Sequence, residues 1–160
     1  MSKSLNRVRQ ALANLQVDTE IVEVTHARTA AEAATSLGCK VDQIANSIIL
    51  LGLETGRVKL FLTSGANRVD IELAALAAGE PLGKADAAVI REQTGFAIGG
   101  VAPVGHLSEV PAWMDPHIAT FERVYAAAGT PRHLFRTDPA TLKRISKAHI
   151  TDFIQENTSM

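Results

Sequence analysis

The segment SIILLGLETGRVKLFLT, residues 47–63, decides the fold. Its first part, Ser47 to Leu53, is an apolar run rich in Ile and Leu, and its second part, Arg57 to Thr63, is another strand-like run. The turn residues Glu54-Thr55-Gly56 join the two runs, so the segment predicts a central β-hairpin. A central hairpin favours a mixed sheet with helices packed around it over a regular doubly wound sheet. The expected fold class is therefore α/β of the mixed kind.

Helices and further strands are predicted on both sides of this hairpin by apolar spacing and by capping residues. The stretch Thr29 to Glu32 matches a capping box, and Gly38 is placed to end the helix that the box starts. Asp138-Pro139 is expected to open the last helix, because Asp accepts bonds from free amides and Pro suits the first helical position. The other expected helices are 5–15, 70–78 and 86–94. The expected inner face of the last helix is Leu142, Ile145, Ala148 and His149. The other expected strands are 20–25, a short one from Phe96, 120–125 and 133–137.

The composition indicates one globular domain, residues 1–160, with a core of small aliphatic side chains. The chain has 160 residues, of which 46% are hydrophobic and only 4% aromatic. Its formal net charge of -1 excludes a histone-like or polybasic binder. Cys39 is the single cysteine, which excludes an internal disulfide framework and favours a cytoplasmic location. No segment has the length or composition of a membrane span or a signal peptide, so no membrane partner is expected.

The most unusual segment is IGGVAPVGH, from Ile98 to His106, which holds three glycines and Pro103. Glycine allows close backbone approach and positive φ, so several amides could point into one concavity that binds a phosphate or an oxyanion. The alternative is a tight corner between two layers of the fold. The segment matches neither a Walker loop nor the dinucleotide-binding pattern of glycines.

The remaining candidate groups give weaker signals. The five histidines are scattered, with no pair at i and i+4, so no metal site is expected. His106 could carry a proton, line a pocket or be a solvated surface residue. The segment from Phe121 to His149 contains six basic and two acidic residues, which gives it a local net charge of +4. These basic residues could bind phosphates, or they could form a solvated face.

In their order along the chain, five segments resemble the YbaK/EbsC family of aminoacyl-tRNA deacylases, which includes the editing domain inserted in bacterial prolyl-tRNA synthetases. The segments are TAAEAATSLG, QIANSIILL, GGVAPVGH, VYAAAGTPRHLF and DPATLKRISKAHITD. The resemblance runs from about Leu5 to Phe153. It implies a mixed β-barrel-like sheet surrounded by helices, and a free-standing protein that hydrolyses the ester between a wrong amino acid and a tRNA.

The resemblance also implies where the reaction takes place. The family's G-x-x-x-P loop maps onto Gly99, Gly100, Val101, Ala102 and Pro103, whose backbone groups would contact the aminoacyl ester. We expect the amides of Gly100 to Ala102 to hold the oxyanion, because preorganised amides stabilise developing charge at no reorganisation cost. Thr29, Gly99, Pro103, Gly105 and His106 are expected to bind the substrate. No cofactor is implied.

One position departs from the family. Where characterised members carry a functional lysine, this chain has Asn46, which hydrogen-bonds but has no charge and cannot act as a base near neutral pH. Three alternatives follow from this difference. In the first, Asn46 positions water or the substrate carbonyl, and the free terminal hydroxyl of the substrate assists. In the second, the protein binds aminoacyl-tRNA or a small ligand without turnover, and in the third, Lys84 or His106 supplies the missing charge.

The leading hypothesis is a trans-editing deacylase with Asn46 as an orienting group and a small apolar pocket that selects Ala, Ser or Thr. The expected partners are the acceptor end of aminoacyl-tRNA and an aminoacyl-tRNA synthetase. The rivals are a catalytically silent binding protein and a general ester hydrolase with no tRNA requirement.

Overall fold

The structure, a computed structural model, describes residues 2–25 and 27–156. The helices are α1 (Lys3–Asn14), α2 (Ala30–Leu37), α3 (Ile71–Ala78), α4 (Ala87–Thr94) and α5 (Pro139–Ser146), with 3-10 turns η1 (Val41–Gln43) and η2 (Pro116–Thr120). The strands are β1 (Ile21–Glu23), β2 (Ile44–Gly52), β3 (Val58–Ser64), β4 (Leu82–Lys84), β5 (Ala112–Met114), β6 (Val124–Ala127), β7 (His133–Thr137) and β8 (His149–Ile150).

A mixed sheet runs through the described residues and confirms the predicted fold class. Its strand order is β1-β7-β6-β2-β3-β5-β8, and β4 pairs with β2 beside this path. The hairpin β2–β3 is antiparallel, from Ala45 opposite Ser64 to Leu51 opposite Val58. The pairs β2–β6 and β3–β5 are parallel, so the central hairpin is flanked by parallel neighbours on both sides.

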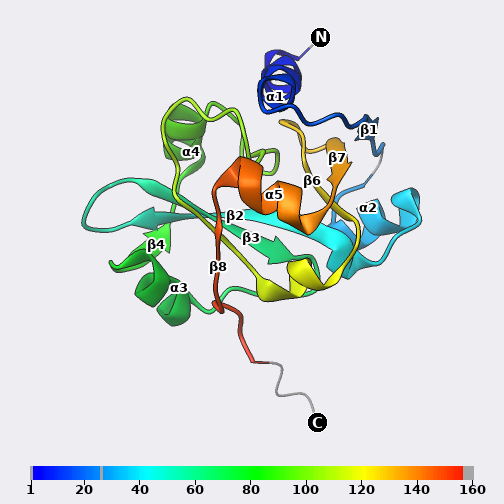
Figure 1. Ribbon diagram of the computed structural model, residues 1–160. Coiled ribbons are helices and arrows are strands. Elements are labelled where there is room, and N and C mark those ends of the chain that lie inside the picture. The colour runs from blue at the N-terminus through cyan, green and yellow to red at the C-terminus, as the bar shows by residue number, and fades with distance from the viewer. Residues whose placement is uncertain (1, 26, 157–160) are drawn as a thin grey trace.

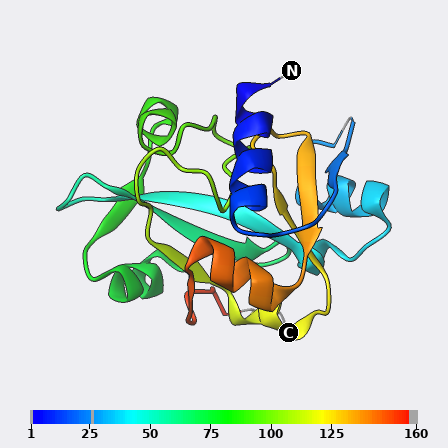
Figure 2. The ribbon, with the colours of Figure 1, turned by 45° about the horizontal axis from the view of Figure 1, so that its top comes forward.

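Helices cover both faces of this sheet (Figures 1 and 2). Successive strand residues point to opposite faces, and the buried clusters follow that alternation. On the first face, α1, α4 and α5 pack on the largest cluster, to which β3 contributes Leu60 and Leu62. On the second face, α3 packs around Phe61 and α2 packs around Leu134. Phe61 stacks on Trp113 and meets Phe153 edge-on, with ring centroids 5.0 Å apart in both pairs, so these three aromatic rings gather under α3.

The helix ends follow the predicted capping chemistry. The Thr29 hydroxyl accepts the amide of Glu32 at 3.1 Å, and Gly38 ends α2 with φ 71°. The Glu32 carboxylate accepts the amide of Arg28 rather than that of Thr29, so the box is shifted by one residue. Asp138 caps α5 by accepting the amide of Thr141 at 2.8 Å.

Several predicted elements are wrong. No strand begins at Phe96, because the chain turns from the end of α4 directly into the glycine-rich loop. The strand expected at 120–125 starts only at Val124 and follows η2. His149 lies in β8 and is exposed, because α5 ends at Ser146 and does not continue to it. Ala148 is buried, as expected, although it also lies beyond the helix.

A buried carboxylate fastens the turn of the central hairpin. Glu80, just after α3, accepts the backbone amides of Glu54 and Thr55, each at 3.0 Å, and the Thr55 hydroxyl at 2.9 Å. Its other contact is the Lys59 ammonium on β3, at 3.1 Å, and both side chains are buried. These donors stabilise the carboxylate and lower the pKa of Glu80 to about 2, the amide of Thr55 contributing most.

None of the helices in the described part of the chain has the length and apolar character that a membrane crossing requires.

Candidate functional site

A cavity of about 560 Å³ opens on the second face of the sheet, beside the cluster under α2. Three separate parts of the chain form most of its wall: the residues that lead into α2, the first half of β2, and the turn between β6 and β7. The glycine-rich loop adds Gly99. The alanines of the wall are Ala27, Ala30, Ala33, Ala45 and Ala127. We call this space the Asn46 cavity.

Asn46 is the polar group on the sheet side of this cavity. It lies on β2 between Ile44 and Ile48, opposite Thr63 of β3, and is half-buried. Ile48 packs with the second-face cluster, so the alternation of the strand places Asn46 on the same face as α2 and α3. Within the described part of the chain, no other group hydrogen-bonds its side-chain amide. The amide is therefore available both to donate to and to accept from a ligand.

Ser47, the next residue along β2, shares the first face with Ala45 and Ile49. Its hydroxyl oxygen is buried and, among the described residues, has no hydrogen-bond partner. A buried hydroxyl without a partner gives up its bonds to water without replacing them. Ser47 thus contributes to the cavity wall at a cost in stability.

The N-terminal end of α2 forms the opposite wall. Thr29 lines the cavity, as predicted, and its hydroxyl oxygen is already the cap of the helix. Because that oxygen accepts the amide of Glu32, its proton remains free to bond a ligand. The adjacent Ala30 and Ala33 leave room in front of the helix. Arg28, which the sequence analysis did not single out, also lines the cavity and is exposed.

The structure separates the residues of the predicted G-x-x-x-P loop. Gly99, with φ 89°, lines the cavity, whereas Gly100, Val101, Ala102 and Pro103 are buried and are not part of its wall. The amide of Gly100 already donates to the carbonyl of Ala97 at 3.0 Å, so it is not free for an oxyanion in this structure.

In the structure Gly100 allows close packing against the backbone of Thr130. A Cβ atom at Gly100 would lie 2.7 Å from the Cα of Thr130, closer than real side chains approach backbone. The missing side chain therefore lets the glycine-rich loop and the turn between β6 and β7 touch.

His106 and Gly105, two other predicted substrate-binding residues, do not line the Asn46 cavity. The His106 Nε2 atom lies 2.6 Å from the Ala102 carbonyl, and the ring meets Phe96 edge-on. Burial lowers the pKa of His106 below its ordinary value, which favours the neutral ring that donates to this carbonyl. Gly105, with φ 79°, packs against Arg7 of α1. Both residues hold the loop in place behind the site.

The turn between β6 and β7 supplies polar groups that the sequence analysis treated only as a turn. Thr130, Pro131 and His133 line the cavity. The Thr130 hydroxyl oxygen accepts the amide of Arg132 at 3.1 Å and lies 2.6 Å from Nδ1 of His133. A hydroxyl can both donate and accept, so the direction of this bond depends on the tautomer of the ring. The other ring nitrogen, Nε2, lies 3.8 Å from the Glu23 carboxylate, so both nitrogens of His133 have a protein partner.

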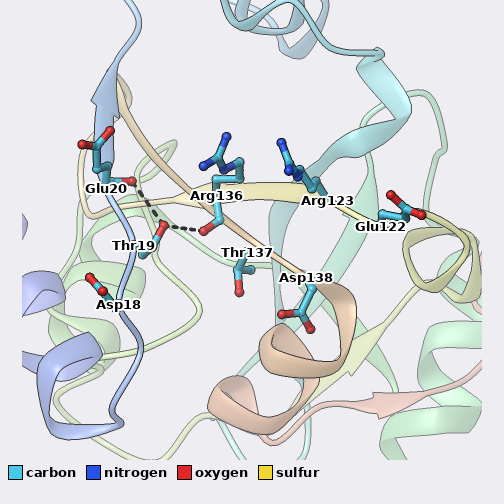
Figure 3. A pocket seen from close by; sticks show the side chains of 8 residues that line it. All are labelled: Asp18, Thr19, Glu20, Glu122, Arg123, Arg136, Thr137 and Asp138. Carbon is cyan, nitrogen blue, oxygen red and sulfur yellow. Dashed lines mark hydrogen bonds between the residues drawn. The ribbon is translucent and has the colours of Figure 1, made fainter.

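The predicted basic segment is divided among three places. Arg132 lies beside the cavity, in the turn just described. Arg123 and Arg136 line a second hollow, of about 400 Å³, with the carboxylates of Asp18, Glu20, Glu122 and Asp138 (Figure 3). Lys143 and Arg144 are exposed on α5, whose buried residues pack on the first face.

No metal site is formed by the residues that the structure describes, since no three His, Cys, Asp or Glu side chains are grouped to hold an ion. His26, one of the five histidines, lies outside the described residues. Lys84 is on β4, and neither Lys84 nor His106 lines the Asn46 cavity. The predicted substitute for the family lysine is therefore not found at either position.

The fold and the cavity together define a mixed α/β protein with a ligand site of alanines, amides and hydroxyls. Comparison with known proteins identifies its family: the aminoacyl-tRNA editing domain matches residues 24–145. The chain belongs to this family.

Individual relatives cover nearly the whole chain. A crystal structure of a proposed trans-editing enzyme for prolyl tRNA synthetase is 42% identical, with a TM-score of 0.90 over 98% of this chain and 99% of that chain. A structure from work on epitope backbone grafting by computational design is 40% identical, with a TM-score of 0.91 over 98% of this chain and 100% of that chain. The uncharacterized protein YwhH of Bacillus subtilis (strain 168) is 26% identical over 144 residues, 89% of this chain and 91% of that protein.

Proposed function

We propose that the protein is a free-standing deacylase that hydrolyses the ester joining a small, wrongly attached amino acid to tRNA. The observation that carries the proposal is the unbonded Asn46 amide facing a cavity walled by alanines. Membership of the editing-domain family supports the reaction class. The likeness to a proposed trans-editing enzyme supports action on tRNA charged by another protein. This activity belongs in the cytoplasm, beside the synthetases that charge tRNA.

In the proposed reaction water attacks the carbonyl carbon of the ester. The bond from that carbon to the ribose oxygen breaks, and the proton from water ends on the ribose hydroxyl. Asn46 donates its amide N–H to the carbonyl oxygen as negative charge develops there. No second donor is assigned to the amides of Gly100 to Ala102, because these residues are buried and do not line the cavity.

The proton acceptor in this mechanism comes from the substrate. Asn46 is not a base near neutral pH, and the two ring nitrogens of His133 face the Thr130 hydroxyl and the Glu23 carboxylate. The free hydroxyl next to the ester on the terminal ribose is then the nearest group that can relay the proton of water. Thr29 and Gly99 are proposed to hold that ribose, since both line the cavity.

Selection in this cavity depends on size. An apolar pocket discriminates by only about 1–3 kcal/mol for each methylene group, so the cavity acts as a coarse sieve. Alanine, serine and threonine fit the proposal, since each has a short side chain that would pack against Ala30 and Ala33.

The decisive experiment measures deacylation of tRNAs charged with Ala, Ser, Thr, Cys and Pro by the native protein. We expect hydrolysis of at least one small misacylated pair and sparing of the correctly charged tRNA. Small aminoacyl esters without tRNA serve as a control, and their equal turnover would instead indicate a general ester hydrolase. No hydrolysis of any substrate contradicts the proposal.

A second candidate is a binding protein without turnover, and the observation that favours it is the uncharged Asn46 amide, which lines the cavity and cannot act as a base near neutral pH. The Asn46→Lys variant separates the two candidates. Activity in Asn46→Lys with none in the native chain would establish the binding protein.

A further inference from the structure

Two arginines belong to the segments at the rim of the Asn46 cavity. Arg28 lines the cavity just before α2, and Arg132 lies in the turn between Pro131 and His133, which both line it. A backbone hydrogen bond of 2.7 Å from the amide of Val24 to the carbonyl of Arg132 ties the two segments together. The fold thus brings the backbones of two arginines that are far apart in the sequence to the same cavity.

Both arginines are available to a ligand. They are exposed, and within the described part of the chain neither guanidinium has a carboxylate oxygen within 4.0 Å. Two carboxylates belong to the same region, but each has another contact. Glu32 accepts the amide of Arg28, and Glu23 faces the ring of His133.

The other basic groups are less suited to an anion that enters this cavity. Arg123 and Arg136 share their hollow with four carboxylates, so that hollow offers no net positive charge (Figure 3). Lys143 and Arg144 belong to α5, on the other face of the sheet from the cavity.

We propose that Arg28 and Arg132 bind the phosphodiester backbone of the single-stranded 3′ end of an RNA whose terminal ribose enters the Asn46 cavity. This inference rests on the proposed function and names the groups that hold the RNA. The phosphodiester before a terminal ribose lies only one sugar away from the ester. When the ribose occupies the cavity, the negative charge of this phosphodiester would therefore lie at the rim. Guanidinium groups suit this partner because they bond two phosphate oxygens at once.

The test measures the dissociation constant of uncharged tRNA over a series of salt concentrations, for the native protein and for Arg28→Gln, Arg132→Gln and the double variant. Each lost phosphate contact should lower the slope of log K against log salt by about 0.7. We expect each single variant to bind several-fold more weakly at low salt, and Arg28→Lys and Arg132→Lys to recover part of the loss. Arg144→Gln on α5 is the matched control and should bind as the native protein does.

Hydrolysis of an aminoacyl ester of adenosine, which keeps the free ribose hydroxyl but has no phosphodiester, separates this inference from the proposed function when it is measured in parallel. Turnover of that ester by Arg132→Gln equal to native, with weakened tRNA binding, supports the inference. Unchanged tRNA affinity and salt slope in the double variant overturn it, even where deacylation is intact. A loss in Arg144→Gln equal to that in the rim variants also overturns it, because the RNA would then bind across α5.

Discussion

In the proposed mechanism Asn46 is the side chain that contacts the reacting carbonyl. If its amide stabilises the developing oxyanion, Asn46→Ala should lower kcat about 10²-fold and leave KM within a few-fold, because the lost bond strengthens only in the transition state. Steady-state kinetics on the best tRNA substrate from the panel would measure both constants. Asn14→Ala, an exposed asparagine of α1, is the control and should match the native protein. Native kcat in Asn46→Ala would remove Asn46 from the mechanism.

Gly100 shows a limit of sequence reasoning at a single residue. The sequence predicts a free amide in a functional loop, and at such a position a side chain would damage activity while sparing the fold. In the structure Gly100 is buried, and a Cβ would lie 2.7 Å from the Cα of Thr130. That contact depends on a segment some thirty positions along the chain, which no local pattern reveals.

The substitution Gly100→Ala should therefore reduce both stability and activity. We expect a loss of about 1–3 kcal/mol in the free energy of unfolding, the usual cost of overpacking, together with a lower kcat/KM from displacement of the Thr130 turn. Urea unfolding and deacylation kinetics on the same preparation would show the two effects. A variant with native stability and no activity would restore the original interpretation of a free, functional loop.

Two buried serines offer a matched comparison of hydroxyl groups. Ser64 donates to the carbonyl of Asp42 at 2.8 Å, whereas the hydroxyl of Ser47 is buried without a partner among the described residues. Ser64→Ala should lower the free energy of unfolding by about 1 kcal/mol, because it removes an existing hydrogen bond. Ser47→Ala should leave the free energy of unfolding unchanged or raise it, because no hydrogen bond is lost. Chemical denaturation of both variants gives the difference. A larger loss in Ser47→Ala than in Ser64→Ala would show that Ser47 has a partner in solution.

Among the elements, the helices, the longer strands and the three-residue β1 were predictable, and the strands β4, β5 and β8 were not. Thr29, Gly38 and Asp138 mark helix ends through chemistry that is local in sequence, and β2 and β3 are long enough to show their apolar runs. The strands β4, β5 and β8 have three residues or fewer, too short for a periodic pattern to form. They exist because neighbours in the sheet pair with them.

The β2–β3 turn is the element whose stability should depend on pH. Glu80 has a pKa of about 2 in the folded chain against an ordinary value of 4.5, so the folded state binds its proton more weakly than the unfolded state does. The stabilisation is complete above pH 4.5 and is lost as the pH falls toward 2. The difference in free energy of unfolding between the native protein and Glu80→Gln should therefore be constant from pH 7 to about 5.5 and shrink below 4.5. Urea titrations at several pH values would measure it, and a difference that does not change with pH would mean that Glu80 is not ionised at the turn.

At the scale of the molecule, the site is an assembly of segments that lie far apart in sequence. The family resemblance predicts that Asn46 and the glycine-rich loop belong to the site, because each lies in a motif that is local in sequence. The meeting of Arg28, Asn46 and Thr130 at one cavity follows only from the order in which β1, β7, β6 and β2 pair. The placement of His106 behind the loop was equally hidden, because burial is a property of the whole fold.

Helix α1 precedes the residues matched by the family, yet it packs against two segments that each contribute a residue to the cavity wall. Gly105 packs on its Arg7, and a Cβ at Gly129 would lie 2.7 Å from the carbonyl oxygen of Ser4. The helix is anchored by Leu5, Val8 and Leu12, all buried in the largest core cluster (Figure 2). The glycine-rich loop and the turn beside His133 therefore depend on the packing of this helix.

Replacing Leu12 by alanine should consequently weaken the whole molecule. Leu12→Ala is expected to lower the free energy of unfolding by about 2–5 kcal/mol, the range for a buried leucine. For a chain of this length that corresponds to a fall in Tm of roughly 5–15 °C. Leu76→Ala, at a leucine of α3 that is 78% exposed, is the matched control and should change stability by no more than about 0.5 kcal/mol. Thermal unfolding of both variants tests the difference, and equal Tm values would mean that α1 is not docked in solution. Since α1 holds the loop and the turn together, we also expect Leu12→Ala to lose activity on heating before Leu76→Ala does.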